Sequence, residues 1–107
     1  MVTEGCVIDG TVENSILSND VHVEAGAVVR DSVIMSGVTV KAGAHISYAI
    51  VDSDTVIGEN ASLGDAREGG SLLVLASGLS LPAGTAIRGG ELVDKDSLAR
   101  FIGKEDT

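Results

Sequence analysis

The chain has 107 residues, so it forms one domain at most. Its formal net charge of −9 argues against nucleic acids and anionic membranes as partners, because both require a basic surface. The aromatic residues are only Tyr48 and Phe101, which favours a narrow interior of small aliphatic side chains and removes base stacking as a means of recognition.

Cys6 is the single cysteine, so no intrachain disulfide can form and a reducing, cytoplasmic location is expected. The sequence contains no apolar run near the length of a membrane span and no signal-peptide pattern.

From Cys6 onward, aliphatic residues recur in steps of six, six and five. The positions are Cys6, Val12, Leu17, then Val23, Val29, Ile34, then Val40, Ile46, Val51, then Ile57 and Leu63, and after residue 69 Leu75, Leu81, Ile87 and Val93. A helix would need a period of 3.6, whereas a fixed repeat of this kind is typical of a solenoid. We therefore predict an all-β fold of about five triangular coils over residues 6–93, each made of three short parallel strands.

Two columns of the repeat hold residues that tolerate a positive φ, and we assign them to the corners of the triangle. The fourth place of each copy holds Asp9, Gly26, Gly43 and Asn60, and the fifteenth place holds Asp20, Gly37 and Asp54. Outward positions are expected to stack as charge ladders, with Glu13 over Arg30 and Glu24 over Lys41.

Two segments break the period. Residues 64–72 are glycine-rich, and we expect them to leave the coil as a small loop. The tail 94–107 places Leu98, Phe101 and Ile102 at helical spacing, which predicts a short helix near 95–102, begun by Asp94 or Asp96, that caps the last coil.

The six-residue rhythm resembles that of the hexapeptide-repeat proteins, which form left-handed parallel β-helices; general crossover rules would favour the right hand instead. In detail the sequence resembles the carboxy-terminal domain of the ADP-glucose pyrophosphorylases (glucose-1-phosphate adenylyltransferases) of bacterial glycogen biosynthesis. The similar motifs are VENSIL at 12–17, GAVVRDSVIM at 26–35, AIVDSDTVIGEN at 49–60 and LPAGTAI at 81–87.

This resemblance implies that the chain is the regulatory and oligomerisation domain of an enzyme that makes ADP-glucose and pyrophosphate from ATP and glucose 1-phosphate. The nucleotidyltransferase domain of the family, with its ATP and Mg²⁺ sites, precedes the β-helix and is absent here, so we expect residues 1–107 to be a single inactive domain with no catalytic, cofactor-binding or metal residues. The resemblance implies three partners: the chain's own amino-terminal catalytic domain, other subunits of a homo- or hetero-oligomer, and an anionic metabolite effector. For the full-length protein the oligomer is expected to be a tetramer.

The sequence departs from the family where Asp52-Ser53-Asp54 stands in place of Asp-Lys-Asn, because that lysine is associated with anionic effectors. The remaining candidates for effector contacts are two arginines in irregular or corner positions, Arg67 and Arg88. The alternative is that both are simply solvated surface residues.

Two other functions are alternatives to this interpretation. A hexapeptide acyltransferase would need a histidine base on an extruded loop, and a three-histidine zinc site would need one histidine more than His22 and His45 provide. These two fall at different corners and two coils apart, so we interpret them as exposed turn residues, and Cys6 as a small core residue. A non-catalytic regulatory paralogue or a pure scaffold is the second alternative.

Overall fold

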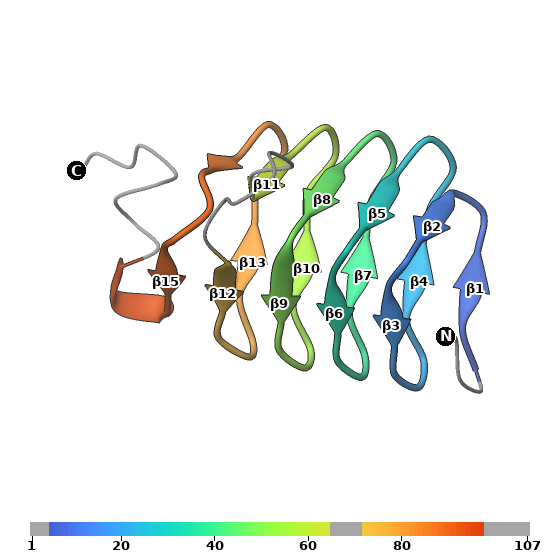
Figure 1. Ribbon diagram of the computed structural model, residues 1–107, viewed down its shortest axis with the longest axis horizontal. Coiled ribbons are helices and arrows are strands. Elements are labelled where there is room, and N and C mark those ends of the chain that lie inside the picture. The colour runs from blue at the N-terminus through green and yellow to red at the C-terminus, as the bar shows by residue number, and fades with distance from the viewer. Residues whose placement is uncertain (1–4, 65–71, 98–107) are drawn as a thin grey trace.

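The structure, a computed structural model, describes residues 5–64 and 72–97, which form a prism with three flat sides (Figure 1). Each side is a five-stranded parallel sheet, and each coil contributes one strand to each sheet. Five coils are therefore stacked, and the prediction of an all-β solenoid of about five coils is confirmed.

The three sheets are named here after their first strands. The β1 sheet contains β1 (Val7–Ile8), β4 (His22–Val23), β7 (Thr39–Val40), β10 (Val56–Ile57) and β13 (Ser80–Leu81). The β2 sheet contains β2 (Thr11–Glu13), β5 (Val28–Arg30), β8 (His45–Ser47), β11 (Ser62–Gly64) and β14 (Ala86–Ile87). The β3 sheet contains β3 (Ile16–Leu17), β6 (Val33–Ile34), β9 (Ala49–Val51), β12 (Leu73–Leu75) and β15 (Leu92–Val93).

The coil is left-handed, as the resemblance implies. In Figure 1 the chain advances from right to left, descends through the strands nearest the viewer, such as β6, and ascends through the paler, more distant strands, such as β7. A right-handed coil advancing in this direction would ascend in front. The general preference for right-handed crossovers is therefore overridden in this fold.

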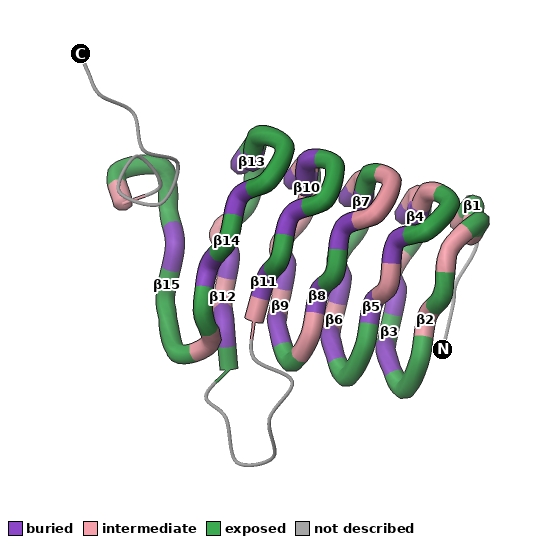
Figure 2. The backbone as a smooth tube through the Cα atoms, turned by 90° about the horizontal axis from the view of Figure 1, so that it is seen from above, coloured by how far each residue is buried: buried purple, intermediate pink, exposed green. Residues whose placement is uncertain are grey.

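The core is made of the inward columns that the repeat predicts. On the β2 sheet, for example, Val29 is 0% exposed and is paired with Val12 on one side and Ile46 on the other. Buried and exposed segments alternate along each coil (Figure 2), because successive side chains of a strand point to opposite faces. Backbone hydrogen bonds between coils, such as Val28 N to Ala44 O at 2.8 Å, hold the columns in register.

The expected corners carry the expected conformation in every coil after the first. Positive φ values are found at Gly26 (81°), Gly43 (75°) and Asn60 (59°) in one column, and at Asp20 (61°), Gly37 (75°) and Asp54 (59°) in the other. Gly84 and Gly78 continue these two columns in the last coil. Glycine, asparagine and aspartate are placed at these corners because they tolerate this region at low energetic cost.

The assignment of Asp9 to this corner is wrong. Val23 pairs with Ile8 and not with Cys6, whereas Val12 pairs with Val29 as expected. The first coil thus turns from β1 to β2 through only two residues, Asp9 and Gly10, where later coils use four. Asp9 accordingly matches Glu24, and it is not among the described residues with a positive φ.

A third corner, between the β2 and β3 sheets, was not predicted. In the first three coils it holds Asn14 (φ 48°), Asp31 (φ 52°) and Tyr48 (φ 51°), and in the last coil Gly90 (φ 85°). The Asn14 Nδ2 donates a hydrogen bond of 2.7 Å to Asp31 Oδ1. A bulky side chain with positive φ is uncommon, so Tyr48 is held there by the strands on either side of it. Its backbone N–H donates to Arg30 O at 3.0 Å and its carbonyl accepts from Leu73 N at 3.1 Å.

The two irregular segments lie mostly outside the described residues. The predicted loop at 64–72 falls largely on residues 65–71, but the pairing shows its effect: Leu75 pairs with Val51, 24 residues away, where Val51 pairs with Ile34, 17 residues away. Of the predicted helix at 95–102, residues 95–97 are described and helical.

Asp94 is the residue that caps this helix. Its Oδ1 accepts a 2.9 Å hydrogen bond from Ser97 N, while Ser97 Oγ accepts one of 2.9 Å from Asp94 N. The two residues thus satisfy backbone donors reciprocally, as in a capping box. The bond from the Ser97 backbone is the main reason that the pKa of Asp94 is lowered from its ordinary value of 3.8.

Candidate functional site

One of the two predicted charge ladders forms. Arg30 Nε lies 3.0 Å from Glu13 Oε1 across neighbouring strands, as expected. Glu24 does not pair with Lys41; its Oε1 instead accepts a 3.1 Å hydrogen bond from Ala42 N. The partly buried backbone N–H of Ala42 therefore binds the Glu24 carboxylate in preference to the exposed ammonium group of Lys41, whose ion pair would be weak.

The two histidines do not form a common site. His22 lies on β4 of the β1 sheet, where its Nε2 is 4.0 Å from Asp9 Oδ2, and His45 is exposed on β8 of the β2 sheet. They belong to different sides of the prism, in agreement with the prediction that they cannot meet within one chain. The prediction that they are turn residues two coils apart is wrong, because both lie on strands and their coils are adjacent.

Cys6 is half-buried and packs against the core, which agrees with a small core residue. Its Sγ donates a hydrogen bond of 3.0 Å to Ser18 O. The shift of register in the first coil places it beside Val21, not beside Val23 as predicted.

Asp52 and Asp54 are engaged by their own turn. Asp52 Oδ1 accepts a hydrogen bond of 2.7 Å from Ser53 N. Asp54 occupies the corner with positive φ, and its backbone N–H donates to Ser36 O at 3.0 Å. The carboxylate contact of Asp52 is local turn chemistry, and Asp54 shapes the corner through its backbone, so both residues have a structural role.

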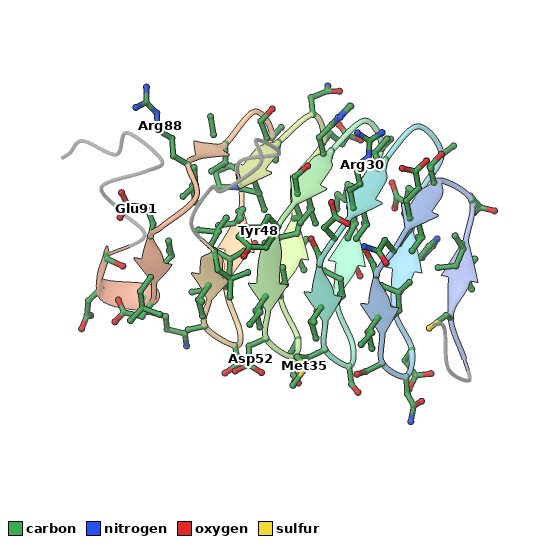
Figure 3. The ribbon with its side chains drawn as sticks, viewed as in Figure 1. Arg30, Met35, Tyr48, Asp52, Arg88 and Glu91 are labelled. Carbon is green, nitrogen blue, oxygen red and sulfur yellow. The ribbon has the colours of Figure 1, made fainter. Side chains whose placement is uncertain are left out.

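Of the two arginines proposed as effector contacts, Arg88 is described and Arg67 lies outside the described residues. Arg88 is exposed directly after β14 and extends away from the coils (Figure 3). Within residues 5–64 and 72–97, ion pairs are found for Arg30 and His22 but not for Arg88. Its guanidinium is therefore presented to solvent, as an anion contact would require.

The described residues do not fit an Mg²⁺–ATP site. In residues 5–64 and 72–97, no three His, Cys, Asp or Glu side chains converge to hold a metal ion. The glycines with positive φ recur at the corners of successive coils, whereas a phosphate-binding loop brings its glycines together in one place. No step of adenylyl transfer is therefore assigned to them.

A buried serine ladder was missed by the sequence analysis. Ser15 and Ser32 are 5% and 4% exposed. Ser15 Oγ donates to Glu13 O at 2.7 Å and accepts from Ser32 N at 3.0 Å. Ser32 Oγ donates to Arg30 O at 2.8 Å and accepts from Ala49 N at 3.2 Å. The signal was a serine repeated at the 17-residue interval before an aliphatic strand.

The outer face of the β3 sheet is apolar, which the sequence analysis also missed. The strands IL, VI, AIV, LVL and LV contain no polar residue. Their outward side chains form one column, Ile16, Val33, Ile50, Val74 and Leu92, paired strand by strand. We call this column the aliphatic stripe. Neither turn chemistry nor the core explains this feature of the described surface.

No helix among the described residues is long and apolar enough to cross a membrane.

Comparison with known proteins agrees with the solenoid. Residues 1–73 match the family model described as "GlmU-like, C-terminal hexapeptide". The chain is 27% identical over 101 residues to proteins named glucose-1-phosphate adenylyltransferase from two strains of Desulfitobacterium hafniense, DSM 10664 / DCB-2 and Y51. The alignment covers 91% of this chain and 25% of each relative, so the chain spans about a quarter of the length of these proteins. No solved structure matches the chain.

Proposed function

The chain belongs to the GlmU-like, C-terminal hexapeptide family, and from this premise we propose that it is the non-catalytic β-helix domain of a cytoplasmic glucose-1-phosphate adenylyltransferase. The observation that carries the proposal is the alignment itself. It covers 91% of this chain but only a quarter of each relative of that name. The remaining three quarters leave room for a separate catalytic domain.

The geometry supports a role without chemistry of its own. The described carboxylates, histidines and thiol are spread over three sides of the prism, and several are engaged in turns or in contacts between coils. Acid–base or nucleophilic catalysis would need such groups within hydrogen-bond reach of one another at one place. In this proposal ATP and Mg²⁺ bind to the catalytic domain of the parent enzyme.

We propose two tasks for the domain in that enzyme. It contacts the catalytic domain and other subunits, and it responds to an anionic metabolite through Arg88 and Arg67. Arg88 supports the second task because its guanidinium is exposed and has no ion pair in the described ranges. Guanidinium groups suit this task because they bind phosphate and carboxylate oxygens in a bidentate manner.

The proposal is tested with a hybrid enzyme in which this chain replaces the matching quarter of a D. hafniense relative. We expect the hybrid to make ADP-glucose from ATP, glucose 1-phosphate and Mg²⁺, and the isolated chain to make none. Acetyl-CoA turnover, which would indicate an acyltransferase, is expected to be absent from both. ADP-glucose formation by the isolated chain would refute the proposal.

The effector role is tested separately, with inorganic phosphate and a sugar bisphosphate as anionic probes. In the hybrid, Arg88→Gln is expected to raise the probe concentration that gives half of the response. Arg30→Gln is the matched control, because Arg30 is also exposed but is paired with Glu13. Equal responses of the two variants would remove Arg88 from the proposal and leave the assignment of the domain intact.

A further inference from the structure

The composition of the β3 sheet differs from that of the other two sides of the prism. All residues of its five strands are aliphatic. The outward positions of the β1 sheet include His22, Thr39 and Ser80, and those of the β2 sheet include Thr11, His45 and Ser62. Parallel strands that read as continuous aliphatic runs are typical of sheets covered on both faces. Among residues 5–64 and 72–97, the buried core covers only the inner face.

The aliphatic stripe extends over all five coils and is open to solvent at both ends. Ile16 in the first coil is 49% exposed and Leu92 in the last is 69% exposed. Further exposed apolar side chains border it, with Tyr48 (42%) and Leu72 (38%) on one edge and Met35 (37%) on the other. Figure 3 shows the labelled Tyr48 above this sheet and Met35 below it. A continuous apolar surface of this kind indicates an interaction site.

We propose that the stripe is the interface of a homodimer, in which a second copy of this chain packs its own β3 sheet face to face with the coils in opposite order. The inference does not depend on the proposed enzymatic parent. The two-fold axis would run along the strand direction of the third coil. Such an interface is isologous, because each copy contributes the same surface.

The order of side-chain sizes supports a second copy as the occupant. Along the stripe the residues run Ile16, Val33, Ile50, Val74, Leu92, which is nearly the same sequence of sizes in both directions. In the opposed arrangement Ile16 faces Leu92 of the other copy, Val33 faces Val74, and Ile50 faces itself. Large residues thus meet large ones and valines meet valines, so the spacing between two stacked sheets stays near 10 Å along the whole face.

The charges beside the stripe select the opposed order over the parallel one. Next to Leu92 lie Glu91, Asp94 and Lys95, whereas the residues around β3 (Asn14, Ser15, Ser18 and Asn19) are all uncharged. Coils running the same way would bring Glu91 and Asp94 of one copy to those of the other. Opposed coils bring this acidic end to a neutral end, so like-charge repulsion at the ends is avoided.

One repulsive contact remains, and it makes the arrangement testable. The third coil meets itself, so the edge that carries Asp52 faces the same edge of the other copy. Together with the net charge of −9, this predicts a dimer that strengthens as salt screens the repulsion. Asp52→Asn should strengthen the dimer at low salt.

The size of the face sets the expected affinity. Five strands spaced about 4.8 Å apart make it about 24 Å long, and some five residues of extended chain make it about 16 Å wide. The resulting flat area of roughly 400 Å² per copy is below the about 800 Å² per partner of a standard stable interface. We therefore expect a reversible dimer that forms at tens of micromolar chain (order of magnitude, from the weak end of interface sizes).

The test is sedimentation velocity of the purified chain from about 1 to about 300 µM, a range that brackets this affinity. Ile16→Glu is the interface variant and Val7→Glu is its matched control. Both residues are aliphatic, lie in the first coil, and are 49% and 50% exposed, but Val7 belongs to the β1 sheet. Because both side chains are exposed, neither substitution should prevent folding, which circular dichroism checks.

We expect the unmodified chain and Val7→Glu to dimerise alike, and Ile16→Glu to weaken the dimer by at least about tenfold, since it would bury a charge. A chain that stays monomeric over this range would overturn the proposal and leave the stripe to a different protein surface. Equal loss of dimer in both variants, or in neither, would overturn the assignment to the β3 sheet.

Disulfide trapping in a Cys6→Ala background tests the order of the coils. Mixing Ile16→Cys chains with Leu92→Cys chains is expected to give the mixed disulfide. Leu92→Cys chains alone should not crosslink, because opposed coils keep the two copies of that position at opposite ends. Efficient crosslinking of Leu92→Cys with itself would show that the coils run in the same direction.

Discussion

The carboxylate of Asp54 occupies the space beside Gly37 in the coil before it: a Cβ added to Gly37 would lie 2.5 Å from Asp54 Oδ1. The same column holds Gly5 beneath Asp20, so glycine and aspartate alternate along this corner. A corner position is therefore constrained twice, by its own φ and by the side chain stacked on it.

Gly37→Ala is expected to destabilise the chain more than Gly84→Ala. Both glycines have a similar positive φ, 75° and 77°, but nothing lies within 4 Å of a Cβ at Gly84. Gly84→Ala should lower the free energy of unfolding by roughly 1 kcal/mol for the backbone conformation alone, and Gly37→Ala by roughly 2–3 kcal/mol. Urea unfolding measures both. Equal losses would mean that the Asp54 side chain moves aside without cost.

Substitution by asparagine at Gly43 and at Gly84 measures the contribution of the contact between neighbouring coils. Gly43 has the positive φ that its slot predicts, but the Asn60 side chain lies where a Cβ on Gly43 would be. Asparagine tolerates this φ, so from φ alone Gly43→Asn would be mild and Gly43→Val severe. The structure adds the contact, and we expect Gly43→Asn to cost about 1 kcal/mol more than Gly84→Asn. Indistinguishable midpoints of urea unfolding would contradict this.

Val29→Asp is expected to unfold the chain, whereas Arg30→Asp should leave it folded. Val29 is 0% exposed, and its burial contributes roughly 1.5–3 kcal/mol, to which a buried unpaired charge adds a larger penalty. Arg30 is exposed and its pair with Glu13 is worth roughly 0–1 kcal/mol. Circular dichroism melts of the two variants decide the matter, and similar melting temperatures would mean that the strand register is wrong.

Ser32→Ala is expected to lower the free energy of unfolding by roughly 1–3 kcal/mol, because the Ala49 N–H would lose its acceptor in the interior. Ser36→Ala is the control, since Ser36 is exposed in a turn. Hydrogen exchange of the Ala49 amide gives an independent measure. Its protection should fall in Ser32→Ala and remain unchanged in Ser36→Ala.

The cap formed by Asp94 should depend on pH. Its pKa is lowered in the folded state, chiefly by the backbone hydrogen bond from Ser97, so its stabilisation is fully present above the ordinary value of 3.8 and is lost as pH falls through the lower folded value. Carboxylate NMR titration should therefore give Asp94 a pKa below that of an unfolded reference. In Asp94→Asn, the acid-induced change in the Ser97 amide signal should disappear, and its persistence would point to another group.

Much of the fold could be predicted from the period of the aliphatic residues, because a solenoid repeats the same burial in every coil. The register of the first coil could not, since Cys6 and Ile8 are both suitable inward residues and only pairing reveals the shorter corner. The third corner was missed although Asn14, Asp31 and Gly90 are residue types that tolerate a positive φ, because Tyr48 interrupts this column in the third coil.

Prediction of functional positions was less complete. The placement of the histidines on different sides followed from the repeat, and the pair formed by Glu13 and Arg30 was found. The predicted pairing of Glu24 with Lys41 was wrong because the prediction considered only side chains, whereas Glu24 binds a backbone N–H. The aliphatic stripe was overlooked because outward positions were assumed to be polar, although its strands contain no polar residue.

The stacked coils differ in length without losing their pairing: the corner after Ile8 is two residues short, and the step from Val51 to Leu75 is seven residues longer than the step from Ile34 to Val51. The hydrogen bonds between neighbouring coils therefore define the architecture. The number of residues that connect successive strands can vary at modest entropic cost. For protein engineering, the step between the paired strands β11 and β12 is where we expect the repeat to accept an inserted peptide epitope or small tag without a change in the strand pairing on either side.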